Sequence, residues 1–90
     1  MTAVRDAIRD KLTQAFAPSV LTIIDDSHRH AGHAGARPEG ETHFRVEIVA
    51  AAFADRSRVA RQRMVYDVLA AELAGPVHAL QLRTLAPGEA

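Results

Sequence analysis

The chain has 90 residues, and its 11 lysines and arginines balance 11 aspartates and glutamates, so its formal net charge at pH 7 is zero with histidine neutral. This length predicts a single domain over residues 1–90, with an ordered core of about residues 3–84, and the absence of cysteine excludes disulfides and a thiolate metal site made by this chain alone. The neutral balance disfavours nucleic-acid binding as the main role, and no apolar run approaches the roughly 20 residues that span a bilayer.

Residues 3–16 have the pattern of an amphipathic helix. Apolar side chains recur every four residues, at Val4, Ile8, Leu12 and Phe16. Pro18 is expected to end this helix, because the residue before a proline is pushed out of helical geometry. The β-branched run over residues 20–24 then predicts a buried strand.

Residues 25–40 consist mainly of Asp, Ser, His, Gly and Pro, which is typical of a long connection without a core of its own. Alternation of apolar and polar residues returns over residues 42–50 and predicts a half-buried strand. Its core-facing residues are expected to be Phe44, Val46, Ile48 and Ala50. The opposite face is expected to carry His43, Arg45, Glu47 and Val49.

A turn over residues 53–57 leads to a second helix, predicted from about Arg58 to Ala74 with Ser57 as its N-cap. Gly75 and Pro76 close this helix. Helical geometry predicts a core-facing side made of Val59, Val65, Tyr66, Leu69 and Leu73.

The last predicted strand covers residues 77–84, with Leu80 and Leu82 facing the core and a frayed tail from Leu85. The element order is therefore helix, strand, strand, helix, strand. It predicts an α+β domain in which helices cover one face of a three-stranded sheet.

Histidines in the long connection are the first candidates for a functional site. The segment HRHAGH contains three of the five histidines of the chain, His28, His30 and His33. Imidazole is the commonest metal-binding side chain, so these residues could hold zinc or another divalent ion together with water. On these residues alone, a solvated, histidine-rich loop is the preferred interpretation.

The two remaining histidines lie at the start of predicted strands. His78 shares its strand parity with Leu80 and Leu82, which places it on the core-facing side and fits either a structural role or a ligand role. His43 has the opposite parity from Phe44 and is interpreted as an exposed strand residue.

A group of arginines surrounds the start of the second helix: Arg56, Arg58, Arg61 and Arg63. These residues could bind phosphate, although helical geometry separates Arg58 and Arg61 from the other two. The alternative is a solvated helix surface that pairs partly with acids such as Asp67.

Catalytic motifs are absent from the sequence: it has no nucleophile elbow, P-loop, Rossmann glycine pattern or zinc-protease motif. Asp25, Asp26, Ser27 and His28 supply the residue types of a triad, but local hydrogen bonds in a turn explain them better. We therefore expect a protein that is not an enzyme.

Four ordered blocks of the sequence resemble the BolA family of small regulatory and iron–sulfur proteins: KLTQAFAPSVLTIIDDS, ETHFRVEIVAAAF, RVARQRMVYDVLAAEL and GPVHAL. The resemblance implies an αββαβ domain with a three-stranded mixed sheet, similar to a type II KH domain. It also implies a role in iron–sulfur trafficking or iron homeostasis, in which the chain binds a monothiol glutaredoxin and glutathione and shares a bridging [2Fe-2S] cluster with them.

The same resemblance implies a set of cluster ligands. His78 in the VHAL block matches the characteristic ligand of the family, and the connection between the first two strands supplies a second ligand, either His30 or His33. Because this chain offers imidazole but no thiolate, the thiolates must come from the partner and glutathione, and no cluster is expected in the isolated chain.

The resemblance implies a second hypothesis, a DNA-binding regulator of transcription that acts through the RVARQRMVY helix and its arginines. The sequence lacks the GXXG loop with which RNA-binding KH domains clamp a phosphate backbone. A soluble cytoplasmic protein without a membrane partner is expected, and the neutral net charge makes a weak homodimer a further expectation.

Overall fold

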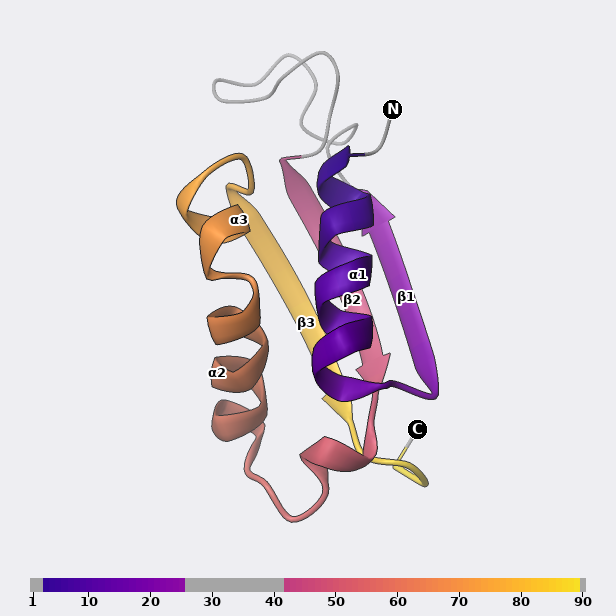
Figure 1. Ribbon diagram of the computed structural model, residues 1–90. Helices are drawn as coiled ribbons and strands as arrows, with labels where there is room; N and C mark the ends of the chain where they lie inside the picture. Colours follow the sequence, from indigo (N-terminus) through magenta and orange to yellow (C-terminus); the bar gives the residue numbers. More distant parts are fainter. Residues whose placement is uncertain (1–2, 26–41, 90) are drawn as a thin grey trace.

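The computed structural model describes residues 3–25 and 42–89. The elements in this part of the chain are α1 (Ala3–Phe16), β1 (Val20–Asp25), β2 (His43–Val49), the short 3-10 helix η2 (Ala51–Phe53), α2 (Arg58–Val68), α3 (Ala70–Ala74) and β3 (Ala79–Leu85). Figure 1 shows α1 and α2 side by side on the same face of the sheet. The predicted order and the α+β class are confirmed. Most of the predicted connection over residues 25–40 lies outside the described residues.

The sheet is mixed, with strand order β1-β2-β3. β1 pairs with β2 in antiparallel orientation, and β3 pairs with β2 in parallel orientation. A parallel pair needs a long crossover, and the segment with α2 and α3 supplies it. As a result, β2 and β3 begin at the same end of the sheet (Figure 1).

The core lies between the helices and one face of the sheet. Ile8 and Leu12 of α1 are fully buried, as their four-residue spacing predicts. From the sheet, Phe44, Val46 and Ile48 of β2 face them as predicted. Other buried members of this cluster are Ile23, Ala50, Phe53, Val65, Leu69 and Val77. Val49 is also buried, contrary to the alternation, because it pairs with Val20 and Leu85 on the opposite face of the sheet.

The second predicted helix is divided into two. Leu69 adopts φ −99° and ψ 18°, which separates α2 from α3 at a position where the sequence predicts one continuous helix. The N-cap prediction is confirmed, since the backbone N–H of Ala60 donates to Oγ of Ser57 over 3.1 Å.

The predicted core face of this helix was partly wrong. Val65 and Leu69 are buried, but Val59 is 57% exposed and Tyr66 is 39% exposed. The face instead includes Arg61 and Glu72, whose side chains are only 11% exposed. Glu72 pairs with Lys11, and Arg61 pairs with Glu89. Because each charge is paired, these side chains can be largely buried at positions that the apolar pattern assigns to the solvent-facing side.

The tail was predicted to fray from Leu85, and the structure contradicts this. The backbone N–H of Ala50 donates to the Leu85 carbonyl over 2.9 Å, and Ala86 is 5% exposed. A turn follows, in which the Glu89 N–H donates to the Ala86 carbonyl over 3.1 Å. The chain therefore stays packed as far as Ala86 and hydrogen-bonded as far as Glu89.

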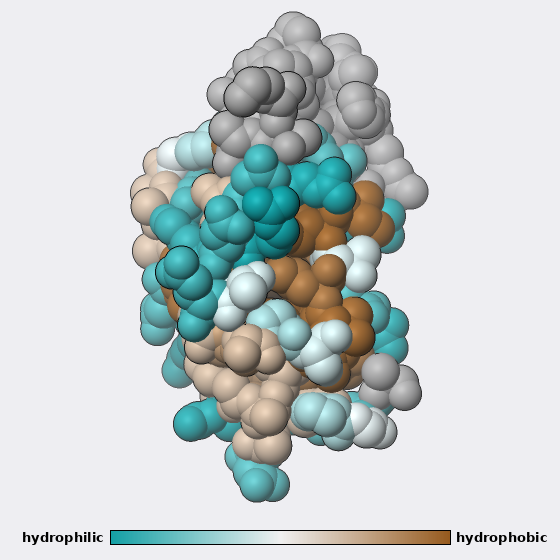
Figure 2. Space-filling view, turned by 45° about the vertical axis from the view of Figure 1, so that its right-hand side comes forward, coloured by the Kyte–Doolittle hydropathy of each residue, from teal (hydrophilic) through white to brown (hydrophobic). Residues whose placement is uncertain are grey.

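Apolar side chains are exposed at the β1 edge, where Val20 is 44% and Ile24 is 43% exposed. Figure 2 is turned toward this side and shows apolar surface next to hydrophilic side chains. Among the described residues, no helix is long and apolar enough to cross a membrane.

An ion pair joins α1 to α3. Lys11 Nζ of α1 lies 2.7 Å from a carboxylate oxygen of Glu72 in α3. Replacing Lys11 with methionine is expected to destabilise the fold by about 1–2 kcal/mol, because it leaves the largely buried Glu72 carboxylate without its cation. Urea unfolding measures this change.

The matched control is Arg9→Met, because Arg9 pairs with Asp6 and Asp10 on the exposed side of α1. This control is expected to change the free energy of unfolding by less than about 0.5 kcal/mol. Equal losses in the two variants would show that the Lys11–Glu72 pair contributes nothing specific.

Candidate functional site

Two histidines lie side by side where β2 and β3 begin. His43 is the first residue of β2 and pairs with Ala79, the first residue of β3, in the parallel register. His78 immediately precedes Ala79. The two ring centroids are 6.2 Å apart in an edge-to-face arrangement. The carbonyl of Thr42 accepts hydrogen bonds from the N–H groups of His78 at 2.7 Å and Ala79 at 3.2 Å. These bonds hold the backbone at His78 against the start of β2.

The two rings differ in their surroundings. His78 is exposed, and it lies before the strand begins instead of on the core-facing side that its parity predicted. His43 is half-buried, and its Nδ1 lies 2.8 Å from Oγ1 of the buried Thr42. When Nδ1–H donates to this hydroxyl, Nε2 keeps the lone pair that a metal ligand needs.

Strand parity alone did not reveal this pair of histidines. Its parity predicts that His43 is an exposed strand residue, whereas the structure leaves it half-buried beside His78. Their proximity follows from the parallel register of β2 and β3, which joins positions 35 residues apart in the chain. The one local signal was that each histidine lies at the start of a predicted strand.

At this end of the sheet, Asp25 of β1 pairs with Phe44 of β2, and the Thr42 carbonyl accepts from the backbone N–H of His78. His28, His30 and His33 lie outside the described residues. The prediction that His30 or His33 is a ligand therefore stays a prediction. Within residues 3–25 and 42–89, no group of three or more His, Cys, Asp or Glu side chains could hold a metal ion.

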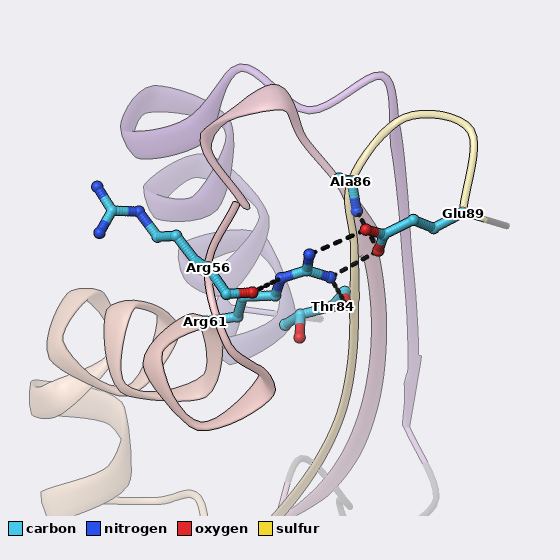
Figure 3. A network of polar contacts seen from close by, with 5 residues as sticks. All are labelled: Arg56, Arg61, Thr84, Ala86 and Glu89. Carbon is cyan, nitrogen blue, oxygen red and sulfur yellow. Dashed lines mark hydrogen bonds and ion pairs between the residues drawn. The ribbon is translucent and has the colours of Figure 1, made fainter. Parts of the chain in front are cut away.

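The arginines of the second predicted site do not converge. Arg61 is engaged on several sides, as Figure 3 shows. Its Nε donates to the Arg56 carbonyl over 3.0 Å, and one terminal nitrogen donates to the Thr84 carbonyl over 3.1 Å. The two terminal nitrogens also bind both carboxylate oxygens of Glu89, at 2.6 Å and 3.0 Å.

The side chains of the other three predicted arginines take no part in this network. The Arg56 side chain extends away from it (Figure 3), and Arg58 and Arg63 are exposed. Of the four, the structure brings only Arg58 and Arg61 to one groove, where Arg83 of β3 joins them. The DNA-binding hypothesis and the weak homodimer stay predictions.

Hydrogen bonds from Arg61 and from the Ala86 N–H lower the pKa of Glu89 from its ordinary value of 4.5 to about 2. The same pairing raises the pKa of Arg61 above its ordinary value. Glu89 is therefore ionised at pH values near neutrality, so its charge pairs with Arg61 over this range.

Glu89→Gln is expected to lower the melting temperature at pH 7, because it removes the charge that Arg61 binds. A depressed carboxylate pKa stabilises the fold above pH 4.5, and this contribution is lost as the pH falls toward 2. The difference between wild type and variant should therefore shrink over this range in thermal unfolding followed by far-UV circular dichroism. A difference that stays constant down to pH 2 would contradict the assignment.

Comparisons with known proteins agree with this fold. The family description "BolA-like protein" matches residues 12–89. An uncharacterized protein in the cobS 5' region of Sinorhizobium is 48% identical over 85 residues, which cover 93% of this chain and 91% of that protein. BolA-like protein 1 of Mus musculus is 45% identical over 86 residues, covering 96% of this chain and 60% of the mouse protein. The chain thus spans less than two thirds of the mouse relative.

Solved structures are similar as well. The BolA domain of SufE1 from Arabidopsis thaliana has a TM-score of 0.82 and 42% identity, with 92% of this chain and 91% of that chain covered. BolA1 from Arabidopsis thaliana has a TM-score of 0.84 and 36% identity, with 97% and 95% covered. The similarity therefore extends over nearly the whole chain.

Proposed function

The chain belongs to the BolA-like protein family, and from this premise we propose that it is a non-enzymatic adaptor that binds a monothiol glutaredoxin and co-ligates a bridging [2Fe-2S] cluster. The observation that carries the proposal is the position of His78. Its ring is exposed at the end of the sheet, while its backbone is fixed by the hydrogen bond to Thr42. The similarity to BolA1 and to the BolA domain of SufE1 is consistent with an iron–sulfur-related role.

The donor set of this chain fits a cluster that two proteins share. A [2Fe-2S] cluster takes four ligands, and two imidazoles can serve one of its irons while thiolates serve the other. The chain has no cysteine, so it can contribute only the imidazole side of such a site. When bound, the cluster supplies one-electron redox chemistry, and imidazole ligation gives it a higher potential than thiolate ligation alone.

His78 would hold the iron, and a second imidazole would come from one of three residues. His43 is 6.2 Å from His78 between ring centroids, and its ring is oriented by Thr42. His30 and His33 are the other two candidates. A ring that is held in place by a hydrogen bond loses little freedom on binding, which favours a defined ligand position.

The proposal is tested by adding the chain to a monothiol glutaredoxin that carries its [2Fe-2S] cluster. A new visible circular dichroism spectrum is expected, together with co-elution of the two proteins and iron on a sizing column. Apo-glutaredoxin is the control, because it separates protein binding from cluster sharing. An unchanged spectrum with separate elution would contradict the proposal.

His43→Ala is expected to weaken the cluster-bound complex about tenfold, because the variant removes either a ligand or the ring that packs against His78. The measurement is the chelator concentration that extracts half of the iron. Gln81→Ala, an exposed substitution further along β3, is the control and should leave this concentration unchanged. Equal behaviour of the two variants would exclude His43 from the site.

A further inference from the structure

A groove lies between α2 and β3, away from the histidine pair. Its volume is about 510 Å³, and its lining consists of Arg58, Arg61, Leu82, Arg83, Thr84 and Leu85. The groove borders the end of β3, whereas His78 precedes the beginning of that strand. It is therefore a different surface from the proposed cluster site.

Three arginines are among the residues that line this groove. The Arg61 side chain is only 11% exposed, and its donors are fixed by the Arg56 and Thr84 carbonyls. Arg83 is 65% exposed and reaches Glu47 only at 3.5 Å, the outer limit of a hydrogen bond. In the described part of the chain, Arg58 is exposed and makes no ion pair. The Arg61 side chain is therefore held in one orientation, whereas the exposed side chains of Arg58 and Arg83 can change conformation.

One carboxylate already binds Arg61. Glu89 accepts from both terminal nitrogens of Arg61, and its Oε1 also accepts from the Ala86 N–H over 3.0 Å (Figure 3). The turn over residues 86–89 returns the carboxylate to this place, and it includes Gly88 with a positive φ of 90°. Glu89 therefore occupies the fork of Arg61 as a ligand from the same chain.

We propose that the groove of Arg58, Arg61 and Arg83 binds a phosphate-bearing small molecule and that Glu89 is its internal competitor. Guanidinium groups bind phosphate oxygens in pairs, as Arg61 binds the two oxygens of Glu89. An external ligand with a single carboxylate would only replace the Glu89 carboxylate, which has the same charge and is already held nearby by the chain. A phosphate carries up to two charges and three acceptor oxygens, so it gains contacts with Arg58 and Arg83 that Glu89 does not make.

The volume of the groove favours a small molecule over a nucleic-acid duplex. Small-molecule sites commonly measure about 300–1,000 Å³, and the groove falls within that range. Its best-fixed donor, Arg61, is nearly buried under the tail, where a rigid duplex backbone makes poor contact. Since Glu89 stays ionised near neutrality, a competing anion and not a change of pH must displace it.

The test is a titration of the full chain with pyrophosphate at low ionic strength, followed by amide chemical shifts and calorimetry. Shifts are expected at Arg58, Arg61 and the residues around Thr84 and Glu89. Glu89→Gln should tighten binding about tenfold, because the tethered competitor loses its charge. Arg83→Gln should weaken binding about threefold to tenfold. Arg63→Gln is the matched control, since Arg63 lies on α2 outside the groove, and it should change little.

Three results would overturn the proposal. One is the absence of pyrophosphate binding to both wild type and Glu89→Gln, which would leave the Arg61–Glu89 pair a purely structural link. Another is equal weakening by Arg83→Gln and Arg63→Gln, which would indicate diffuse charge attraction. The third is binding of a 20-base-pair duplex without binding of pyrophosphate, which would assign the surface to a nucleic-acid backbone. Because no iron or glutaredoxin is present, these outcomes are independent of the proposed adaptor function.

Discussion

His78→Ala is expected to abolish the cluster-bound complex with a monothiol glutaredoxin and to leave the fold of the chain intact. His78 is exposed and contributes its backbone N–H, not its ring, to the hydrogen bond that holds β3 against β2. Alanine keeps this N–H and removes only the imidazole. Without this donor, one coordination position of the cluster has no ligand from the chain.

The measurement is the visible circular dichroism spectrum of the mixture, with thermal unfolding of the variant alone as the check on folding. His78→Cys provides a rescue, because a thiolate also ligates iron and should restore the complex with an altered spectrum. A spectrum of His78→Ala identical to that of wild type would remove His78 from the site.

Phe53→Ala is expected to cost about 3–5 kcal/mol of unfolding free energy, the range for deleting a buried aromatic side chain. Phe53 is fully buried in η2, and its ring centroid lies 5.1 Å from that of Phe16 at the end of α1. A domain of this size has a total stability of about 5–10 kcal/mol, so the variant should lose roughly a third or more of it. Urea unfolding measures the loss.

Val59→Ala is the matched control for this prediction. The apolar pattern placed Val59 on the core-facing side of its helix, but the structure leaves it 57% exposed. Its substitution should therefore change stability by less than about 0.5 kcal/mol. A loss comparable with that of Phe53→Ala would show that the sequence pattern, and not the structure, describes the core face of α2.

The parts of the fold that could be predicted from the sequence are those with strictly local causes. The four-residue spacing of Ile8 and Leu12 defines α1, and alternation at Phe44, Val46 and Ile48 defines β2. Ser57 was found as an N-cap because its hydroxyl bonds to a backbone N–H three residues away. These interactions need no knowledge of distant segments.

The predictions of the helix core face and of the histidine positions were wrong where contacts with distant residues outweigh the local sequence pattern. The inward position of Arg61 depends on Glu89, which is 28 residues further along the chain, and that of Glu72 depends on Lys11. Apolar periodicity assigns charged residues to the solvent-facing side, and the predicted core face of the helix was therefore turned toward Val59 and Tyr66. The proximity of His43 and His78 depends in the same way on strand pairing between distant segments.

The most direct test of the adaptor function asks whether nitrogen from this chain binds iron. The chain is labelled with 15N-histidine, combined with an unlabelled monothiol glutaredoxin carrying a [2Fe-2S] cluster, and reduced for electron–nuclear double resonance spectroscopy. A strong 15N coupling is expected, and it should disappear in His78→Ala. A reduced mixed complex without 15N coupling would contradict cluster ligation by this chain.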